Sequence, residues 1–253
     1  MHTRRDVLAG VTTLGSAVLA GCSGDTGGGD DAGGDDASGD AETGTRTTPS
    51  EDGTDRTTTT DANADSDLET HPGTAGLDGQ PTLGLDPTEA TGVVVAFEDP
   101  SCPTCARWER QTFPTLQSKL VDGGDVAFVF RGYPVIKPWG EPATKALEAT
   151  YDRDAGVFWR LRAHYFANQG AFDAETVLSK TEAFLADTAV DGAAVVAAVR
   201  NGDADAAVNV DLSAGRAANV RGTPGFLLFR DGSFRTKVIG AQGYDVFATA
   251  LGG

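Results

Sequence analysis

Two cysteines separated by two residues, Cys102 and Cys105, are the side chains of this chain best suited to chemistry. They follow an apolar run, GVVVAFED (92–99), and precede a segment, TCARWERQTFPTLQSKL, whose apolar residues recur at helical spacing. Three uses of such a pair are open: a structural disulfide, half of a metal site, or a redox centre. The third and last cysteine is Cys22, so its use decides how many sulfurs remain.

Cys22 ends an N-terminal segment with the composition of a targeting signal. Arg4 and Arg5 precede an apolar stretch (7–20) and small residues. TRRDVL resembles a twin-arginine export signal, and LAGC resembles a lipobox, in which the signal is cut before the cysteine and the sulfur is acylated. The resemblance makes residues 1–21 the signal peptide and Cys22 the lipid-attachment site, and the alternative is an ordinary signal peptide with a chance cysteine. An acylated sulfur has no redox chemistry, which leaves one isolated pair.

Residues 22–78 differ in composition from the rest of the chain. They are rich in Gly, Asp, Ser and Thr and have almost no large apolar side chains, so they cannot bury enough surface to offset chain entropy. We expect a disordered tether that holds a domain off a membrane surface, and a glycosylated Thr-rich stalk is the alternative. Residues 23–71 contain 14 of the 37 acidic residues and two arginines, and so carry most of the net charge of −17.

The acidic balance and the scarcity of lysine resemble the composition of proteins from extreme halophiles, in which carboxylates keep the surface hydrated in concentrated salt. A chain of this charge repels phosphate backbones, and no basic patch is visible in the sequence. Nucleic acid is therefore excluded as a partner. Residues 79–253 are enough for one domain with a sizeable core.

The order of the apolar patterns predicts an α/β domain. Residues 92–99 and 126–135 are short apolar runs that fit buried strands, and the helical segment between them implies a βαβ unit with a parallel strand pair. Residues 141–220 show only helical spacing and predict an all-helical insertion. The Asp-Gly dipeptide at 231–232 predicts a β-hairpin, and residues 243–251 predict a short final helix.

A zinc site is disfavoured by the supply of ligands. A tetrahedral site needs four, and the chain has no second cysteine pair. The histidines are His2 in the signal, His71 in the tether and His164 in a helical segment, where we expect a half-buried packing role. Copper(I) bound by the two thiolates stays open, although the initiator Met1 is the single methionine in the sequence.

The remaining use of the pair is thiol–disulfide exchange at the N-terminus of a helix. Unpaired backbone N–H groups and the helix dipole stabilise an anion there. They lower a cysteine pKa from about 8.5 into the range of roughly 3.5 to 7.5. Cys102 is then the exposed nucleophile, and Cys105, one turn further along, resolves the mixed disulfide. Pro103 is acceptable in the first turn of such a helix.

Residues 79–253 resemble the thioredoxin fold in its DsbA-like form. FEDPSCPTC resembles the strand and CPxC active site, FVFRGYPV the next strand, ATKALEATYDRDAGVFWRLRAHYFANQGAF the helical insertion, and RGTPGFLLF the Thr-Pro before a later strand. The resemblance implies that Cys102 and Cys105 are the catalytic pair. It also implies that Pro224 is a cis-proline facing the disulfide and that Thr223 offers backbone hydrogen bonds to an extended substrate.

Two departures from the family pattern concern proton transfer and oxidising strength. Thioredoxin-like proteins often have a buried carboxylate six residues before the first cysteine, where this chain has Ala96. Glu98 and Asp99 lie nearer the end of the strand, are expected to be more exposed, and are the candidates for a proton route through water. Pro103 and Thr104 support the active site, but DsbA itself has a histidine in place of the threonine, so the sequence leaves the redox potential open.

The resemblance implies an exported, lipid-anchored protein thiol–disulfide oxidoreductase with no cofactor other than the Cys102–Cys105 disulfide. Its expected partners are the thiols or disulfides of exported proteins and a membrane redox partner, and export favours disulfide formation. A thiol reductase or isomerase, for instance in cytochrome maturation, is the first alternative. A non-enzymatic copper(I)-binding lipoprotein is the alternative from another class.

Overall fold

The computed structural model describes residues 66–252. The expected signal peptide (1–21) with Arg4 and Arg5, the lipidation site Cys22 and the tether up to residue 65 lie outside the described residues. None of the helices in the described range is long and apolar enough to span a bilayer.

In chain order the elements are α1 (Asp67–Thr70), the 3-10 helix η2 (Pro72–Thr74), β1 (Thr82–Leu83), β2 (Gly92–Glu98), α2 (Pro103–Gln111), α3 (Phe113–Leu116), the π-helix η3 (Gln117–Val121), β3 (Val126–Gly132), α4 (Gly140–Tyr151), α5 (Ala155–Ala167), the 3-10 helix η4 (Gln169–Ala171), α6 (Val177–Leu185), α7 (Gly192–Asn201), α8 (Asp205–Ala217), β4 (Gly225–Arg230), β5 (Ser233–Ile239) and α9 (Tyr244–Leu251).

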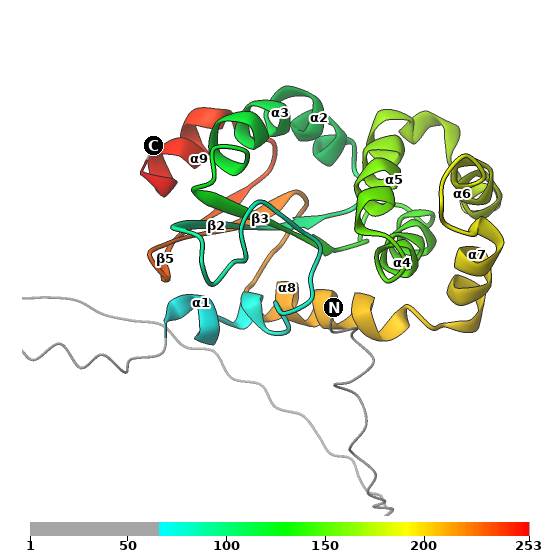
Figure 1. The fold of residues 1–253 in the computed structure, drawn as a ribbon, viewed down its shortest axis with the longest axis horizontal. Helices are drawn as coiled ribbons and strands as arrows, with labels where there is room; N and C mark the ends of the chain where they lie inside the picture. Colours follow the sequence, from blue (N-terminus) through cyan, green and yellow to red (C-terminus); the bar gives the residue numbers. More distant parts are fainter. Residues whose placement is uncertain (1–65, 253) are drawn as a thin grey trace, which may run out of the picture. The chain divides into compact units, whose positions relative to one another are not determined.

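Five strands form one mixed sheet in the order β1-β3-β2-β4-β5 (Figure 1). β2 and β3 are parallel, as the βαβ pattern predicted, and end together with Glu98 opposite Gly132. β4 is antiparallel to both β2 and β5. The β4–β5 hairpin turns at Asp231 and Gly232, which both have positive φ (50° and 73°), as a type I′ turn requires. The start of β4 and the end of β5 therefore lie beside the end of β2, where the cysteines follow.

Alternate residues of β2 enter different cores, because successive side chains of a strand point to opposite faces of the sheet. Val94 and Ala96 belong to the cluster formed with α2, α3 and α9. Val95 and Phe97 belong to the cluster formed with α1 and α8 on the other face (Figure 1). All seven residues of β2 are buried, as expected of a strand covered on both faces.

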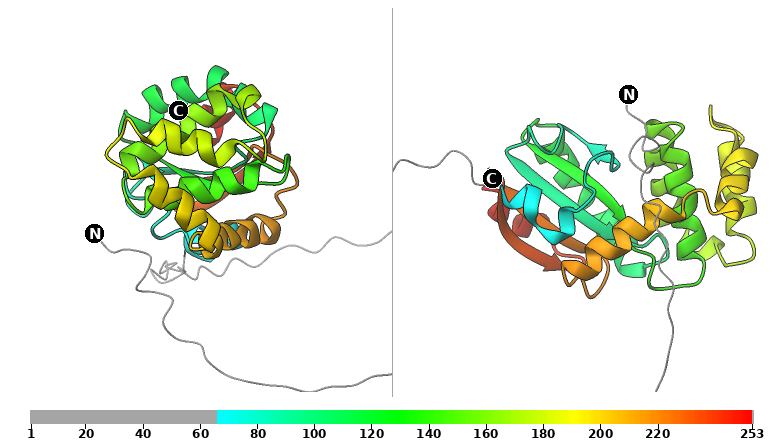
Figure 2. Two further views of the ribbon diagram at one scale, coloured as in Figure 1. Left: turned by 90° about the vertical axis from the view of Figure 1, so that its right-hand side faces the viewer. Right: turned by 90° about the horizontal axis from the view of Figure 1, so that it is seen from below.

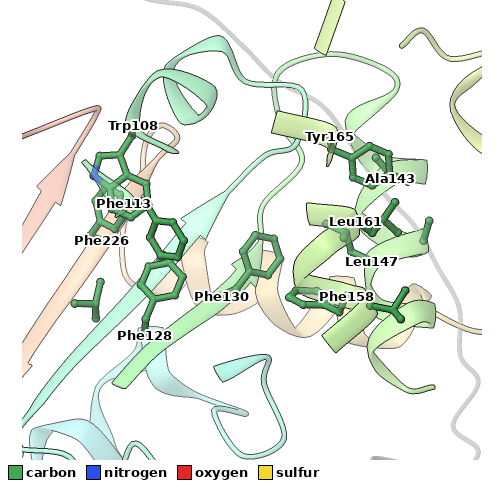
Figure 3. Packing of buried hydrophobic residues seen from close by; sticks show 14 of the residues in the cluster. Trp108, Phe113, Phe128, Phe130, Ala143, Leu147, Phe158, Leu161, Tyr165 and Phe226 are labelled. Carbon is green, nitrogen blue, oxygen red and sulfur yellow. The ribbon is translucent and has the colours of Figure 1, made fainter. Parts of the chain in front are cut away.

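Helices α4 to α7 form the predicted insertion and lie beside the sheet (Figure 2). Phe130 of β3 packs edge-on against Phe158 of α5, with ring centroids 5.5 Å apart, so the insertion and the sheet share one core (Figure 3). The insertion was predicted to reach residue 220. However, α8 covers the face of the sheet opposite α2, with Ala214 in the same cluster as Phe97. Helical spacing showed that α8 has an apolar face but could not show what that face would pack against.

The folded domain begins earlier than the predicted boundary at residue 79. Residues 66–78, expected in the tether, form α1 and η2, and the side chain of Ser66 caps α1. Leu68 is buried in the cluster that contains Val95 and Phe97, and the ring of His71 stacks on Phe234 at a centroid distance of 4.8 Å. The segment is polar in composition, yet one apolar side chain and one stacked ring dock it on β5.

Candidate active site

Both cysteines lie at the N-terminus of α2, as the sequence indicated. Cys102 is the N-cap, Pro103 is the first helical residue, and Cys105 lies in the first turn. The side chain of Pro103 is exposed, and that of Thr104 is half-buried. Both cysteines are free thiols in this structure. Cys105 is fully buried and Cys102 is only 3% exposed, so the expectation of an exposed Cys102 is wrong, because Phe166 of the insertion covers the pair.

The loop before β4 lies against the first cysteine. The Thr223–Pro224 peptide bond is cis, as the resemblance implied. The Sγ of Cys102 donates a hydrogen bond to the carbonyl oxygen of Thr223 at 3.3 Å. The Oγ1 of Thr223 is buried without a partner among residues 66–252, and it can donate to the sulfur once Cys102 is ionised. Because β4 runs antiparallel beside β2, its first residues are held at the end of the sheet where α2 begins.

The two thiols differ in pKa. The pKa of Cys102 is lowered to about 5, first because the thiol of Cys105 hydrogen-bonds its thiolate, and further because Thr223 and the backbone N–H groups of Cys105 and Thr104 do so. The pKa of Cys105 is raised well above its ordinary value, mainly by burial and also by the neighbouring charges of Glu98 and Cys102. At neutral pH the pair therefore consists of one thiolate, at Cys102, and one thiol.

Glu98, the last residue of β2, is fully buried rather than exposed as expected, because the helical insertion covers the end of the strand. It forms an ion pair with Arg162 of α5. Burial raises the pKa of Glu98 to about 8, although the charge of Arg162 opposes the shift. Glu98 is thus a carboxyl group that exchanges protons near neutral pH, close enough to Cys105 for its charge to raise the pKa of that thiol.

Arg162 joins two carboxylates in a buried network that sequence reasoning missed. Its Nη1 donates to Oε2 of Glu109 at 3.0 Å, and its Nη2 donates to both Glu98 and Glu109. Five aromatic rings have their centroids 4.9–5.6 Å from its Cζ, and their faces favour a cation: Phe113, Phe128, Phe130, Trp159 and Phe166. The signal available in the sequence was Arg162 at a core-facing position of α5, in the segment FWRLRAHYF.

Asp99 is also fully buried, against expectation. The β3–α4 loop packs over it, and backbone N–H groups of that loop satisfy its carboxylate. Its Oδ2 accepts from the backbone N–H groups of Val135 and Ile136 at 2.8 and 2.7 Å. Its Oδ1 accepts from the N–H and hydroxyl of Ser101 at 2.7 and 2.6 Å, and the Ser101 Oγ accepts from the N–H of Lys137 at 3.0 Å. Asp99 therefore fixes the β3–α4 loop against the loop that leads into α2.

Gln169, in η4, is a second residue that the sequence did not single out. Its side-chain amide donates to the carbonyl oxygens of Pro100 and Cys102 at 2.7 and 2.9 Å. These bonds hold the helical insertion to the backbone of residues 99–102, the segment between β2 and α2 that we call the cysteine loop. Ala96 lies buried on β2 opposite Phe226, so no carboxylate occupies that position, and Glu98, two residues later, is the carboxyl group whose charge raises the pKa of Cys105.

The described residues offer little to a metal ion. Within residues 66–252 no group of three or more His, Cys, Asp or Glu side chains is placed to hold one. His164 is half-buried and stacks on Phe184 at a centroid distance of 4.4 Å, which is the packing role expected for it. His71 stacks on Phe234 and accepts a hydrogen bond from the N–H of Gly73. A soft metal ion at the cysteines would therefore find two sulfurs as its ligands.

Comparison with known proteins adds a family and three related structures or sequences. A thioredoxin family model matches residues 79–240. The chain is 32% identical over 105 residues, 42% of this chain and 46% of that protein, to disulfide bond formation protein D of Bacillus subtilis. It is similar in structure to oxidised BdbD from Bacillus subtilis (TM-score 0.60, 24% identity, 70% of this chain and 95% of that chain). It is also similar to the thiol-disulfide exchange protein α-DsbA2 from Wolbachia pipientis (TM-score 0.57, 17% identity, 73% and 92%).

The matches differ in how much of each chain they cover. The chain spans less than half the length of the curated relatives that it matches. The two structural matches are below 25% identity and show the fold. The family match covers more than half of the chain and includes both cysteines and the Thr223–Pro224 bond.

Proposed function

Because the chain belongs to the thioredoxin family and has its α/β fold with a DsbA-like helical insertion, we propose that it is an extracytoplasmic protein thiol–disulfide oxidoreductase that forms disulfides in exported proteins. The observation that carries the proposal is the difference in pKa between the two cysteine thiols at the start of α2. Cys102 has a pKa of about 5, and Cys105 is fully buried as a thiol. The relative named for disulfide bond formation supports the oxidising direction.

The oxidative half-reaction proceeds through a mixed disulfide at Cys102. A substrate thiolate attacks the Sγ of Cys102 in the Cys102–Cys105 disulfide, a bond to the substrate forms, and Cys105 leaves as a thiolate. A second substrate thiolate then attacks the substrate sulfur, the substrate disulfide forms, and Cys102 leaves as a thiolate. Two electrons pass from the substrate to the enzyme pair. The low pKa of Cys102 makes it the better leaving group in this second step.

We propose that Glu98 donates a proton to the Cys105 thiolate and accepts it again when the disulfide re-forms. Once released, the Cys105 thiolate requires a proton, because its pKa is well above neutral. The carboxyl group of Glu98, with a pKa of about 8, is protonated at pH 7 and can supply that proton, then recover it when the disulfide is formed again. Arg162 holds the carboxyl group of Glu98 in place in both protonation states. Asp99 is committed to four hydrogen bonds and is not used in this step.

The Thr223–Pro224 segment is proposed as the place where the substrate backbone lies. The Thr223 carbonyl is 3.3 Å from the Cys102 sulfur, so a polypeptide paired with this segment would bring its own cysteine to that sulfur. Turnover also requires an oxidant that accepts the two electrons, and we propose a membrane redox partner for that role.

We propose that Cys22 anchors the protein to the membrane after removal of residues 1–21. The support is the LAGC sequence behind Arg4 and Arg5. Cys22→Ser should move the protein from the membrane fraction to the medium and leave thiol exchange in vitro unchanged, and Arg4→Lys with Arg5→Lys should block export. Finding the wild-type protein wholly in the medium with residue 1 intact would contradict the proposal.

The decisive experiment for the function is oxidation of a reduced, unfolded protein by the purified disulfide form. We expect stoichiometric oxidation by wild type and none by Cys102→Ser. The equilibrium with glutathione then decides the direction, since a potential of about −120 mV indicates an oxidase and one of about −270 mV a reductase. If neither thiol exchanged with dithiols while both bound one copper(I) ion, the enzyme proposal would fall and a copper carrier would replace it.

A further inference from the structure

In the stretches of chain that border the cysteines the exposed charged residues are basic, although the domain as a whole has more acidic than basic residues. Five stretches of chain surround the cysteines, because they contain the cysteine loop and the segment before β4 or contact one of the two. We call them the active-site rim: residues 100–110, 133–139, 164–172, 219–224 and 239–243. The one carboxylate in these stretches is that of Glu109, which is 9% exposed and paired with Arg162. The exposed charged side chains within the rim are therefore basic.

On α2 the basic residues continue the face that begins with the cysteine pair. Pro103, Arg107 and Arg110 are exposed, while Cys105 is buried. Their spacing of four and three residues places them on one side of the helix. A substrate that lies on Cys102 and follows α2 therefore meets Pro103 and then two arginines.

Two further basic residues lie on the other sides of the rim. Lys137 is exposed in the β3–α4 loop, and its backbone N–H donates to the Ser101 Oγ at 3.0 Å, so the loop is held next to the cysteine loop. Arg221 is exposed two residues before Thr223, and its Nε donates to Oδ1 of Asn219 at 2.8 Å. We call Arg107, Lys137 and Arg221 the rim bases.

Exposed apolar side chains accompany the rim bases. Val135 and Ile136 are 49% and 47% exposed in the loop that Asp99 fixes, and Ile239 is 42% exposed at the end of β5, opposite Gly225. The first two lie in a loop bound to Asp99, and the third lies beside the start of β4. We call Val135, Ile136 and Ile239 the rim apolar residues.

Among the rim bases, Arg221 bonds to Asn219, whereas Arg107 and Lys137 have no partner within residues 66–252. The low pKa of Cys102 arises from hydrogen bonds with Cys105, Thr223 and backbone N–H groups, not from these charges. Two exposed, unpaired cations beside exposed apolar groups favour a ligand that has carboxylates and apolar side chains together.

We propose that the active-site rim binds an extended, acidic polypeptide segment, whose apolar side chains contact the rim apolar residues while its carboxylates lie beside the rim bases. The inference rests on the proposed function and names its substrate class: exported proteins that are themselves acidic. The chain's own residues 23–65 are acidic but contain no Val, Ile, Leu, Met or aromatic residue. They cannot supply the apolar contacts, which favours a separate polypeptide.

The test uses the full-length protein in its disulfide form and three reduced two-cysteine peptides. The peptides share their cysteines and apolar residues and differ in carrying Asp, Ser or Lys at the other positions. Each second-order rate constant is divided by that of the same protein with dithiothreitol, which removes effects on the sulfur itself. About 0.15 M salt, with a Debye length of about 8 Å, screens the charges of the tether and of the far side of the domain.

Arg107→Glu with Lys137→Glu should lower the normalised rate for the acidic peptide about tenfold and raise that for the basic peptide. The matched control is Arg200→Glu with Arg235→Glu, two exposed bases outside the rim, which changes the net charge equally and should alter both rates less than twofold. Arg107→Gln with Lys137→Gln should give a smaller change of the same sign. Circular dichroism verifies the fold of each variant.

Three outcomes overturn the inference. The control pair could lower the acidic-peptide rate as much as the rim pair does, or the three peptides could react at equal normalised rates. A rise in the neutral-peptide rate on reversal of the rim charges would show instead that residues 23–65 occupy the rim. In these cases exchange with dithiothreitol persists, so the proposed function stands. If dithiothreitol and all peptides fail to react, the proposed function falls as well.

Discussion

The sulfur of Cys102 lies 3.3 Å from the carbonyl oxygen of Thr223, a residue 121 positions later in the chain. The contact exists because β2 and β4 are antiparallel neighbours, so that β4 starts at the end of the sheet where β2 stops. Cys105, one turn into α2, is fully buried and makes no contact with the Thr223 segment that would correspond to the Cys102–Thr223 hydrogen bond. A substrate sulfur that approaches along the Thr223 segment therefore meets Cys102 first.

We expect the two cysteines to behave differently when each is replaced. Cys105→Ser leaves the Cys102 mixed disulfide without a resolving thiol, so adducts should accumulate as slow-migrating bands on a non-reducing gel. Cys102→Ser should form no adducts and keep its fold, since the pair closes a loop of only four residues and constrains the unfolded chain little. If Cys105 were alkylated faster than Cys102 at pH 7, the assignment of the nucleophile would be wrong.

The stability of the reduced form should rise with pH relative to the disulfide form. The pKa of Cys102 is about 5 in the folded protein and is near its ordinary, higher value in the unfolded chain. Between about pH 5 and 8 the unfolded chain then binds more protons, so the free energy of unfolding increases with pH and the gain is lost as pH falls through 5. The slope is at most about 1.4 kcal/mol per pH unit, and less where water screens the sulfur.

Urea unfolding of both forms at several pH values measures this difference. Glu98 acts in the opposite sense, because its folded pKa of about 8 lies above its ordinary value of 4.5. Its contribution is full below pH 4.5 and is lost as pH rises through 8. Glu98 is present in both redox forms, so the part of its contribution that does not depend on the Cys102 charge cancels in the comparison. An identical pH dependence in the two forms would contradict the low pKa of Cys102.

Glu98→Gln should change the pH profile of the step that releases or uses the Cys105 proton. In wild type, resolution of the mixed disulfide by Cys105 should accelerate as Glu98 ionises around pH 8 and accepts the thiol proton. The amide cannot ionise, so the variant should lose that inflection. Stopped-flow rates between pH 6 and 9 measure it, with the exposed Glu141→Gln as control. An unchanged inflection would remove Glu98 from the proton route.

Above pH 8, where Glu98 is ionised, Arg162→Met should destabilise the domain by about 3–5 kcal/mol, because it leaves the buried carboxylates of Glu98 and Glu109 without their cation. Combining it with Glu98→Gln and Glu109→Gln should recover part of the loss, since the uncompensated charges are then removed. Arg160→Met, at an exposed position of the same helix, should stay within about 0.5 kcal/mol of wild type. Chemical denaturation measures all three variants, and a triple variant no more stable than Arg162→Met would argue against the charge network.

Local patterns in the sequence determined the elements and the reactive pair. The strand at 92–98 and the helix after it follow from apolar spacing, and the hairpin follows from Asp231 and Gly232, whose positive φ values such a turn needs. The position of Cys102 and Cys105 at a helix start also needs only neighbouring residues. These features depend on contacts within a few residues, which is why the sequence alone suffices for them.

Only the tertiary structure decided the surroundings of that pair. Glu98 and Asp99 looked exposed at the end of a strand, but α5 supplies Arg162 and the β3–α4 loop supplies two N–H groups, and both acids are buried. Gln169 reaches the cysteine loop from a position 67 residues after Cys102. Burial, ion pairing and the grouping of the rim bases arise when segments distant in sequence pack together, and no local pattern encodes which segments those will be.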